Sequence, residues 1–146
     1  MKPITLSHKF VEAIPEKLDE EILYIAIDYA TAIHKCCCGC GKEVVTPLSP
    51  TDWKLVYDGV SVTLSPSIGN WSFDCKSHYW IESNKVRWAA QWTDEQIEAG
   101  RSLDQRVKAQ HCKQEKIRIE STRRHDNRTP HTGLLSRLKR WFTGER

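Results

Sequence analysis

The residues with the most distinctive chemistry in this chain are its cysteines. The 146 residues include 6 cysteines, and four of these lie within five consecutive positions, at Cys36, Cys37, Cys38 and Cys40. Disulfides between such close neighbours would be strained, and buried free thiols that pack as small hydrophobes are not expected at this density. Tetrahedral sulfur and imidazole ligation suits Zn²⁺, which has no redox chemistry of its own. The cluster therefore predicts a Zn²⁺ site.

The expected ligands come from two segments about 35 residues apart. One closed ligand set consists of cysteines alone: Cys36, Cys38, Cys40 and Cys75. Such a set would be structural, because it leaves no position open for a catalytic water. Three further residues are alternative ligands: His34, Cys37 and His78. The remaining cysteine, Cys112, lies alone in a polar segment and is not part of the predicted site.

The segments that must position these side chains are predicted to be strands. Apolar and polar residues alternate, as in half-buried strands, or form short β-rich runs. The runs lie at 22–27, 30–36, 53–57, 60–65, 77–81 and 86–90. Asp58-Gly59 is a two-residue hairpin signal, and Ser83-Asn84 marks a second turn. We therefore predict a mainly β fold, a small zinc-stabilised antiparallel β-meander or barrel, followed by a C-terminal helix and a basic amphipathic tail.

The pattern predicts that the chain is organised into three parts. They are a zinc-pinned β-domain at 1–92, a polar helix at 93–126, and a linker with a short basic amphipathic helix at 127–146. Thr93 and Gln96 fit a capping box at the start of the polar helix. Five of the 6 tryptophans fall within the forty residues 53–92, where we favour a role in the core over a recognition surface.

Charge and hydropathy exclude several classes of protein. Residues 1–93 carry a net charge of −2 and residues 94–146 a net charge of +5, so the aromatic-rich half is acidic. A phosphate-binding face should be basic, which argues against nucleic acid as the partner. No run approaches the ~20 apolar residues of a membrane span. The N-terminus also lacks the apolar core of a signal peptide. We therefore expect a cytoplasmic protein without a transmembrane segment.

Four stretches of sequence, taken in combination, resemble a known bacterial family. They are His34-x-Cys36-x-Cys38-Gly39-Cys40-Gly41, Val44-Val45-Thr46-Pro47-Leu48-x-Pro50-Thr51-x-Trp53, Pro66-Ser67-Ile68-Gly69-Asn70-Trp71 and Cys75-x-Ser77-His78-Tyr79-Trp80-Ile81. The family consists of small metal-binding proteins encoded beside multi-ubiquitin-like proteins and their activating and conjugating enzymes. The resemblance covers about residues 20–92. In the family pattern position 37 is usually not cysteine, which favours Cys36, Cys38 and Cys40 as ligands over Cys37.

The resemblance implies a place in a bacterial ubiquitination-like pathway. Its implied partners are a ubiquitin-like protein and its conjugates, together with the activating and conjugating enzymes. Such a pathway needs a peptidase that trims the ubiquitin-like protein and removes it from its targets, and the resemblance implies that this family supplies a serine-type peptidase or deconjugase. The alternative is a non-catalytic zinc-binding adaptor. The sequence shows no complete, well-spaced catalytic triad, which favours that alternative.

Residues suited to acyl transfer occur in the last two of these stretches. Ser67 is the candidate nucleophile and His78 its base, because strand alternation turns His78 away from Ser77 and leaves Ser67 free to approach it. Asn70 could donate a hydrogen bond to an oxyanion. Candidates to orient the imidazole are Asp74, Asp52 and His34. Cys75 with His78 is an alternative, cysteine-type pair.

Overall fold

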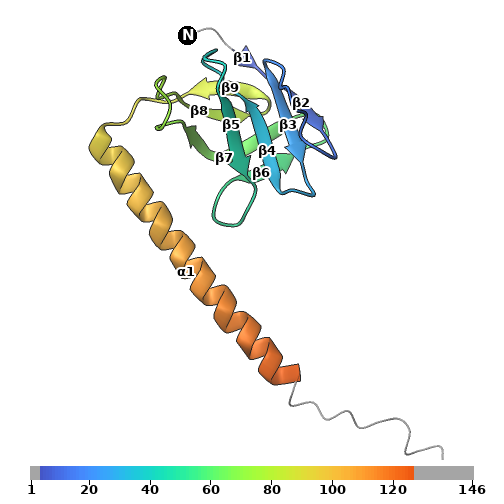
Figure 1. Cartoon of the computed structure of the whole chain (residues 1–146), viewed down its shortest axis with the longest axis vertical. Helices are drawn as coiled ribbons and strands as arrows, with labels where there is room; N and C mark the ends of the chain where they lie inside the picture. The colour runs from blue at the N-terminus through green and yellow to red at the C-terminus, as the bar shows by residue number, and fades with distance from the viewer. Residues whose placement is uncertain (1–3, 127–146) are drawn as a thin grey trace, which may run out of the picture. The chain divides into compact units, whose positions relative to one another are not determined.

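The computed structural model describes residues 4–126, in which nine strands precede one long helix (Figure 1). The chain divides into two compact units. The first, Met1–Val107, holds the strands and the first turns of the helix, and the second begins at Lys108 within the helix. The amphipathic segment predicted at 127–146 lies outside the described residues.

The strands form two sheets, which confirms the mainly β fold. The first sheet has the order β1 (Ile4–Thr5), β9 (Lys85–Trp88), β8 (His78–Glu82), β7 (Val62–Gly69) and β6 (Lys54–Tyr57). The second has the order β2 (Ser7–Phe10), β3 (Ile22–Ala26), β4 (Thr31–Lys35) and β5 (Glu43–Pro47). Strands β3 to β5 and β6 to β9 are antiparallel meanders. Strands β2 and β3 are parallel, a pairing that no alternation pattern in the sequence predicts.

Apolar side chains from both sheets meet in one core. Its fully buried members include Leu23 and Ile25 of β3, Leu64 and Ile68 of β7, and Tyr79 and Ile81 of β8. Burying one such aliphatic side chain contributes about 1.5–3 kcal/mol to the free energy of folding. Cys36 and Cys37 belong to the same buried cluster. The start of the cysteine-rich loop is therefore anchored in the core.

The turn between β8 and β9 lies at Ser83-Asn84, where the sequence predicts a turn, and it has two residues. Both residues have positive φ, of 48° and 65°, as a primed hairpin turn requires. The side-chain Oδ1 of Asn84 accepts the Val62 N–H at 2.9 Å, and the Asn84 carbonyl accepts the Leu6 N–H at 2.7 Å. One turn residue thus joins β7, β8, β9 and the start of the chain.

The loop between β6 and β7 is longer than the predicted two-residue turn. Tyr57 pairs with Val62, so four residues separate the two strands. The Asp58 carboxylate accepts the N–H groups of Val60 and Ser61, which closes an Asx-type loop in place of a tight primed turn. The same hydrogen bonds hold the pKa of Asp58 below its usual value.

The helix α1 (Asp94–Asp126) begins with the predicted capping box. The Thr93 N–H donates to Gln96 Oε1 at 2.9 Å, and the Gln96 N–H donates to Thr93 Oγ1 at 3.3 Å. Ile97 in the first turn is buried, while four apolar residues farther along are exposed: Leu103, Val107, Ile117 and Ile119. Within residues 4–126, no helix combines the length and the apolar character needed to cross a membrane.

We expect Asn84→Ala to lower the free energy of unfolding by about 2 kcal/mol. The substitution places alanine at a φ of 65° and removes the acceptor of the Val62 N–H. Asn84→Gly removes the same acceptor but tolerates the positive φ, so its cost should be smaller. Urea denaturation followed by tryptophan fluorescence measures both variants. Equal losses in the two would contradict a contribution from the left-handed backbone.

Candidate functional site

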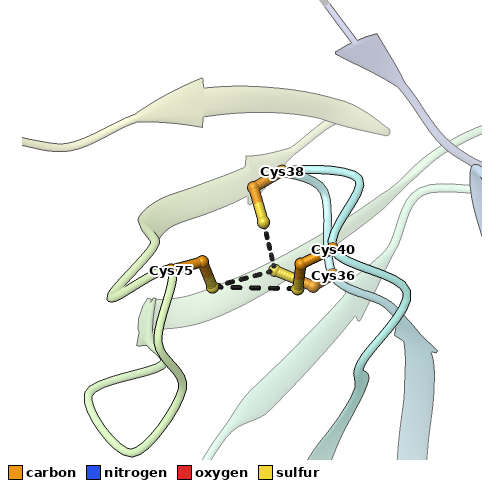
Figure 2. Close-up of side chains that lie close together, drawn as sticks. All are labelled: Cys36, Cys38, Cys40 and Cys75. Carbon is orange, nitrogen blue, oxygen red and sulfur yellow. Dashed lines mark hydrogen bonds between the residues drawn. The ribbon is translucent and has the colours of Figure 1, made fainter.

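Two loops from different parts of the chain bring four cysteines together (Figure 2). The first loop follows β4 and contains Cys36, Cys38 and Cys40, while the second precedes β8 and contains Cys75. The two glycines of the first loop have φ of 83° and 76°, a conformation that a side chain with a Cβ atom disfavours. The chain can therefore reverse direction tightly enough to turn three thiols toward one point.

The sulfur atoms already stand close to the positions of four metal ligands. Cys36 Sγ lies 3.3 Å from Cys38 Sγ and 4.0 Å from Cys75 Sγ, and Cys40 Sγ lies 3.8 Å from Cys75 Sγ. All four sulfurs lie within 4.8 Å of one another. Zn–S bonds of ~2.3 Å in a tetrahedron would place the sulfurs about 3.8 Å apart. Four cysteine sulfurs at this spacing could hold a zinc ion.

Two buried polar side chains contact this cluster from the sheet side. Ser77 Oγ lies 3.1 Å from Cys36 Sγ, and Asn70 Nδ2 donates to Ser77 Oγ at 2.9 Å and toward Cys36 Sγ at 3.8 Å. Burial raises the pKa of Cys36. Burial acts in the same direction on Cys75, but hydrogen bonds from Ser77 and the neighbouring thiols outweigh it and lower the pKa of Cys75 to about 7. Partners of this kind orient metal ligands and favour their thiolate form.

The three alternative ligands lie outside the group of converging sulfurs. His34 is fully buried with Nε2 2.8 Å from the Tyr79 hydroxyl, and burial lowers its pKa to about 4, so the ring is neutral at neutral pH. Cys37 is buried in the core, which raises the pKa of its thiol to about 12. His78 has another neighbour, Ser67.

A bulge in β7 places Ser67 beside His78. The pairing of β7 with β8 shifts register between Leu64 and Ile68, so three residues of β7 oppose a single residue of β8. Bulges re-aim side chains in this way and often occur next to active sites. Ser67 lies within the bulge, and its Oγ is 3.0 Å from His78 Nε2. This distance lies within the hydrogen-bonding range expected of a nucleophile and its base.

The other ring nitrogen of His78 is held by the backbone. Its Nδ1 lies 2.9 Å from the Ala90 carbonyl oxygen, in the segment after β9. A carbonyl can only accept, so the neutral ring carries its proton on Nδ1 and leaves Nε2 to accept the Ser67 hydroxyl proton. His78 is only 5% exposed, so its ring is largely shielded from bulk water.

Three tryptophans surround the His78 ring. The ring centroid of His78 lies 4.9 Å from that of Trp71, 5.2 Å from that of Trp92 and 5.7 Å from that of Trp80. Trp53 and Trp88 instead pack against the core. The predicted core role therefore describes two of the five clustered tryptophans, and the other three gather at the serine–histidine pair.

The remaining predicted site residues lie elsewhere. Asp74 Oδ2 forms a surface ion pair with Lys42 Nζ at 2.8 Å. The Asp52 carboxylate accepts a hydrogen bond from the Ser49 hydroxyl. Asn70, predicted as an oxyanion donor, directs its amide toward the cysteine side of the sheet. The Ala90 carbonyl occupies the place at His78 Nδ1 that an orienting carboxylate takes in a triad.

A comparison with protein families gives these features a context. The model of the family described as bacterial ubiquitination-like system serine protease (BubE) matches residues 10–89, more than half of the chain. The chain belongs to the BubE family. The match contains all four clustered cysteines together with Ser67 and His78. No curated protein and no solved structure matches the chain.

The BubE assignment confirms the resemblance to a family of bacterial ubiquitination-like systems, and the family description names a serine protease. Sequence reasoning missed Ala90, because a backbone carbonyl leaves no side-chain signal. It also missed the gathering of Trp71, Trp80 and Trp92, although the density of tryptophan in this part of the chain was a usable signal.

We expect the purified protein to contain about one equivalent of metal, and Cys38→Ser, Cys40→Ser and Cys75→Ser each to lose it. The free energy of binding such an ion is also free energy of folding, so these variants should unfold at lower temperature. Cys112→Ser, at an exposed position of α1, is the matched control and should retain the metal. Elemental analysis and thermal melts test this. Metal-free wild-type protein whose melting temperature is unchanged by chelator would contradict it.

Proposed function

We propose that this BubE family protein is a serine-type protease that cleaves a ubiquitin-like protein from its precursor or from its conjugates. The observation that carries the proposal is the hydrogen-bonded series from Ser67 Oγ to His78 Nε2, and from His78 Nδ1 to the Ala90 carbonyl. The family description supports protease activity in a ubiquitination-like system. The ubiquitin-like substrate is inferred from that system.

In the proposed mechanism Ser67 Oγ attacks the scissile carbonyl while His78 Nε2 takes the hydroxyl proton. The peptide C–N bond then breaks, and the same proton passes from His78 to the leaving amine. Water then attacks the ester carbonyl while His78 takes a proton from it, and the bond between the carbonyl carbon and Ser67 Oγ breaks as His78 returns that proton to Ser67. The positive charge that His78 carries between these steps is stabilised by the Ala90 carbonyl, which continues to accept from Nδ1.

A cysteine nucleophile fits the structure less well. Cys75 Sγ lies among the other clustered sulfurs, and the available nitrogen of His78 faces Ser67. We propose that Cys36, Cys38, Cys40 and Cys75 bind Zn²⁺ as a structural ion. Four protein ligands would fill a tetrahedral site and leave no position for a reacting water.

The proposed ion would hold the loop after β4 to the loop between β7 and β8. Cys75 lies three residues before His78, and Asn70 and Ser77 contact both the cysteine cluster and the strand pair. We therefore place Asn70 on the metal side of the site. Its proposed task is to support the sulfur of Cys36 and the start of β8.

We expect Ser67→Ala and His78→Ala each to reduce cleavage of a ubiquitin-like precursor by about 10³-fold or more, with the double variant no worse than either single one. A nucleophile and its base act as a unit, which is why the losses should not add. Mass spectrometry of the products gives the rates, and elemental analysis should show unchanged metal content in all three variants.

Ser72→Ala is the matched control, since it removes the hydroxyl of an exposed serine in the loop after β7. It should cleave at the wild-type rate. Full activity in Ser67→Ala would overturn the serine mechanism. Binding of the ubiquitin-like protein without any cleavage by the wild type would instead support the adaptor alternative. Loss of metal in His78→Ala would identify His78 as a ligand.

A further inference from the structure

The segment between β9 and α1 carries the hydrogen-bond partner of His78. The Ala89 N–H donates to the His78 carbonyl at 2.9 Å, and the next residue, Ala90, accepts from His78 Nδ1 at 2.9 Å. Ala90 lies beyond the last paired residue of β9 and is exposed. The sheet fixes this segment on the Ala89 side, so a second constraint is needed after Ala90 to hold the carbonyl in place.

Trp92, two residues after Ala90, supplies this second constraint. Its indole is stacked on that of Trp71, with 5.5 Å between centroids and 20° between planes. It also meets the His78 ring edge-on, at 5.2 Å and 76°. Aromatic pairs in such arrangements are stabilised beyond the effect of the area that they bury. Trp92 therefore contacts the His78 imidazole through its side chain, and its backbone belongs to the same short segment as the Ala90 carbonyl that orients this ring.

The position of Trp92 is fixed from its other side by the first turns of α1. Ile97 is buried, and Lys76 Nζ lies 3.5 Å from Asp94 Oδ1. A Cβ atom at Gly100 would come within 3.0 Å of Trp92 Cζ3, so the absence of a side chain there leaves space for the indole. A Cβ atom at Gly69 would likewise overlap the Trp71 indole. Two glycines thus make room for the stacked pair.

We propose that Trp92 is a positioning residue for the Ser67–His78 pair. Stacked on Trp71 and packed against Gly100, it holds the Ala90 carbonyl against His78 Nδ1 and keeps water away from the ring. The imidazole therefore stays in the tautomer whose Nε2 accepts from Ser67. A backbone acceptor on an irregular segment needs this support more than a carboxylate fixed in a core would. The inference rests on the proposed serine-protease function and adds to it a residue outside the match to the family model.

The first test observes the imidazole directly and needs no substrate. In wild-type protein labelled with ¹⁵N-histidine, we expect the neutral His78 ring to appear as the Nδ1–H tautomer with a slowly exchanging proton. Trp92→Ala should mix the two tautomers and accelerate exchange of that proton, while Trp92→Phe, which keeps an aromatic ring, should retain the wild-type signal. Leu103→Ala removes an exposed apolar side chain of the same helix and is the matched control.

The second test measures the reactivity of Ser67 with a fluorophosphonate. In this reaction Ser67 Oγ bonds to phosphorus, fluoride leaves, and the hydroxyl proton passes to His78. Trp92→Ala should slow labelling by about 10- to 100-fold, the range expected when a catalytic group is misplaced by about 1 Å. Trp92→Phe and Leu103→Ala should label at close to the wild-type rate.

The variant Gly100→Ala distinguishes a loss of positioning at Trp92 from a general loss of protein stability. Alanine favours the helix over glycine, yet its Cβ atom would press on the indole. We expect slower labelling with a melting temperature no lower than that of the wild type. A wild-type tautomer and labelling rate in Trp92→Ala would overturn the positioning role and leave the proposed function standing. Full precursor cleavage by Ser67→Ala would overturn the proposed function, while the imidazole signal would still decide the role of Trp92.

Discussion

The pairing of β7 with β8 determines where each functional side chain of this protein lies. Adjacent residues of an extended chain point to opposite faces, so Ser77, just before β8, and His78, its first residue, face different surroundings. Ser77 turns toward Cys36 in the cysteine cluster, and His78 turns toward Ser67. A slip of one residue in this register would exchange the two faces and separate both sets of contacts. The core side chains of the same strands, Ile68 and Tyr79, resist such a slip because both are fully buried.

The bulge in β7 and the cysteine loops each add contacts to the β7–β8 pair. The bulge adds residues on one strand, so that Ser67 reaches the Nε2 of His78 even though it is not its register partner. The cysteine loops act at the start of β8, just before His78, where Cys75 joins the sulfurs that follow β4. The two sheets are thus connected by side chains at the point where the candidate base begins its strand. A small domain with one modest core gains most from a connection of this kind.

Main-chain and aromatic groups orient the histidine, and among residues 4–126 it is the Ala90 carbonyl, not a carboxylate, that lies at its Nδ1. A backbone carbonyl fixes the tautomer as a carboxylate does, but it brings no full negative charge to stabilise the imidazolium. The surrounding indole rings contribute aromatic contacts to the imidazole and no charge. The rings also leave His78 nearly inaccessible to solvent. The site therefore relies on shielding and fixed geometry more than on net charge.

Short-range chemistry in the sequence was sufficient to predict a cysteine cluster, the Ser83-Asn84 turn, the capping box of α1 and the alternating strands. Each of these depends on residues close together in the chain, or on side-chain types that have few other uses at such density. The four-residue loop at Asp58 was missed because its carboxylate bonds compete with a tight turn that the sequence also permits. The parallel pairing of β2 with β3, the Ala90 carbonyl at His78 and the three tryptophans around it were decided by tertiary structure alone. They bring together groups that are distant in sequence, and one of them is a main-chain atom that every residue possesses, so no local pattern distinguishes them.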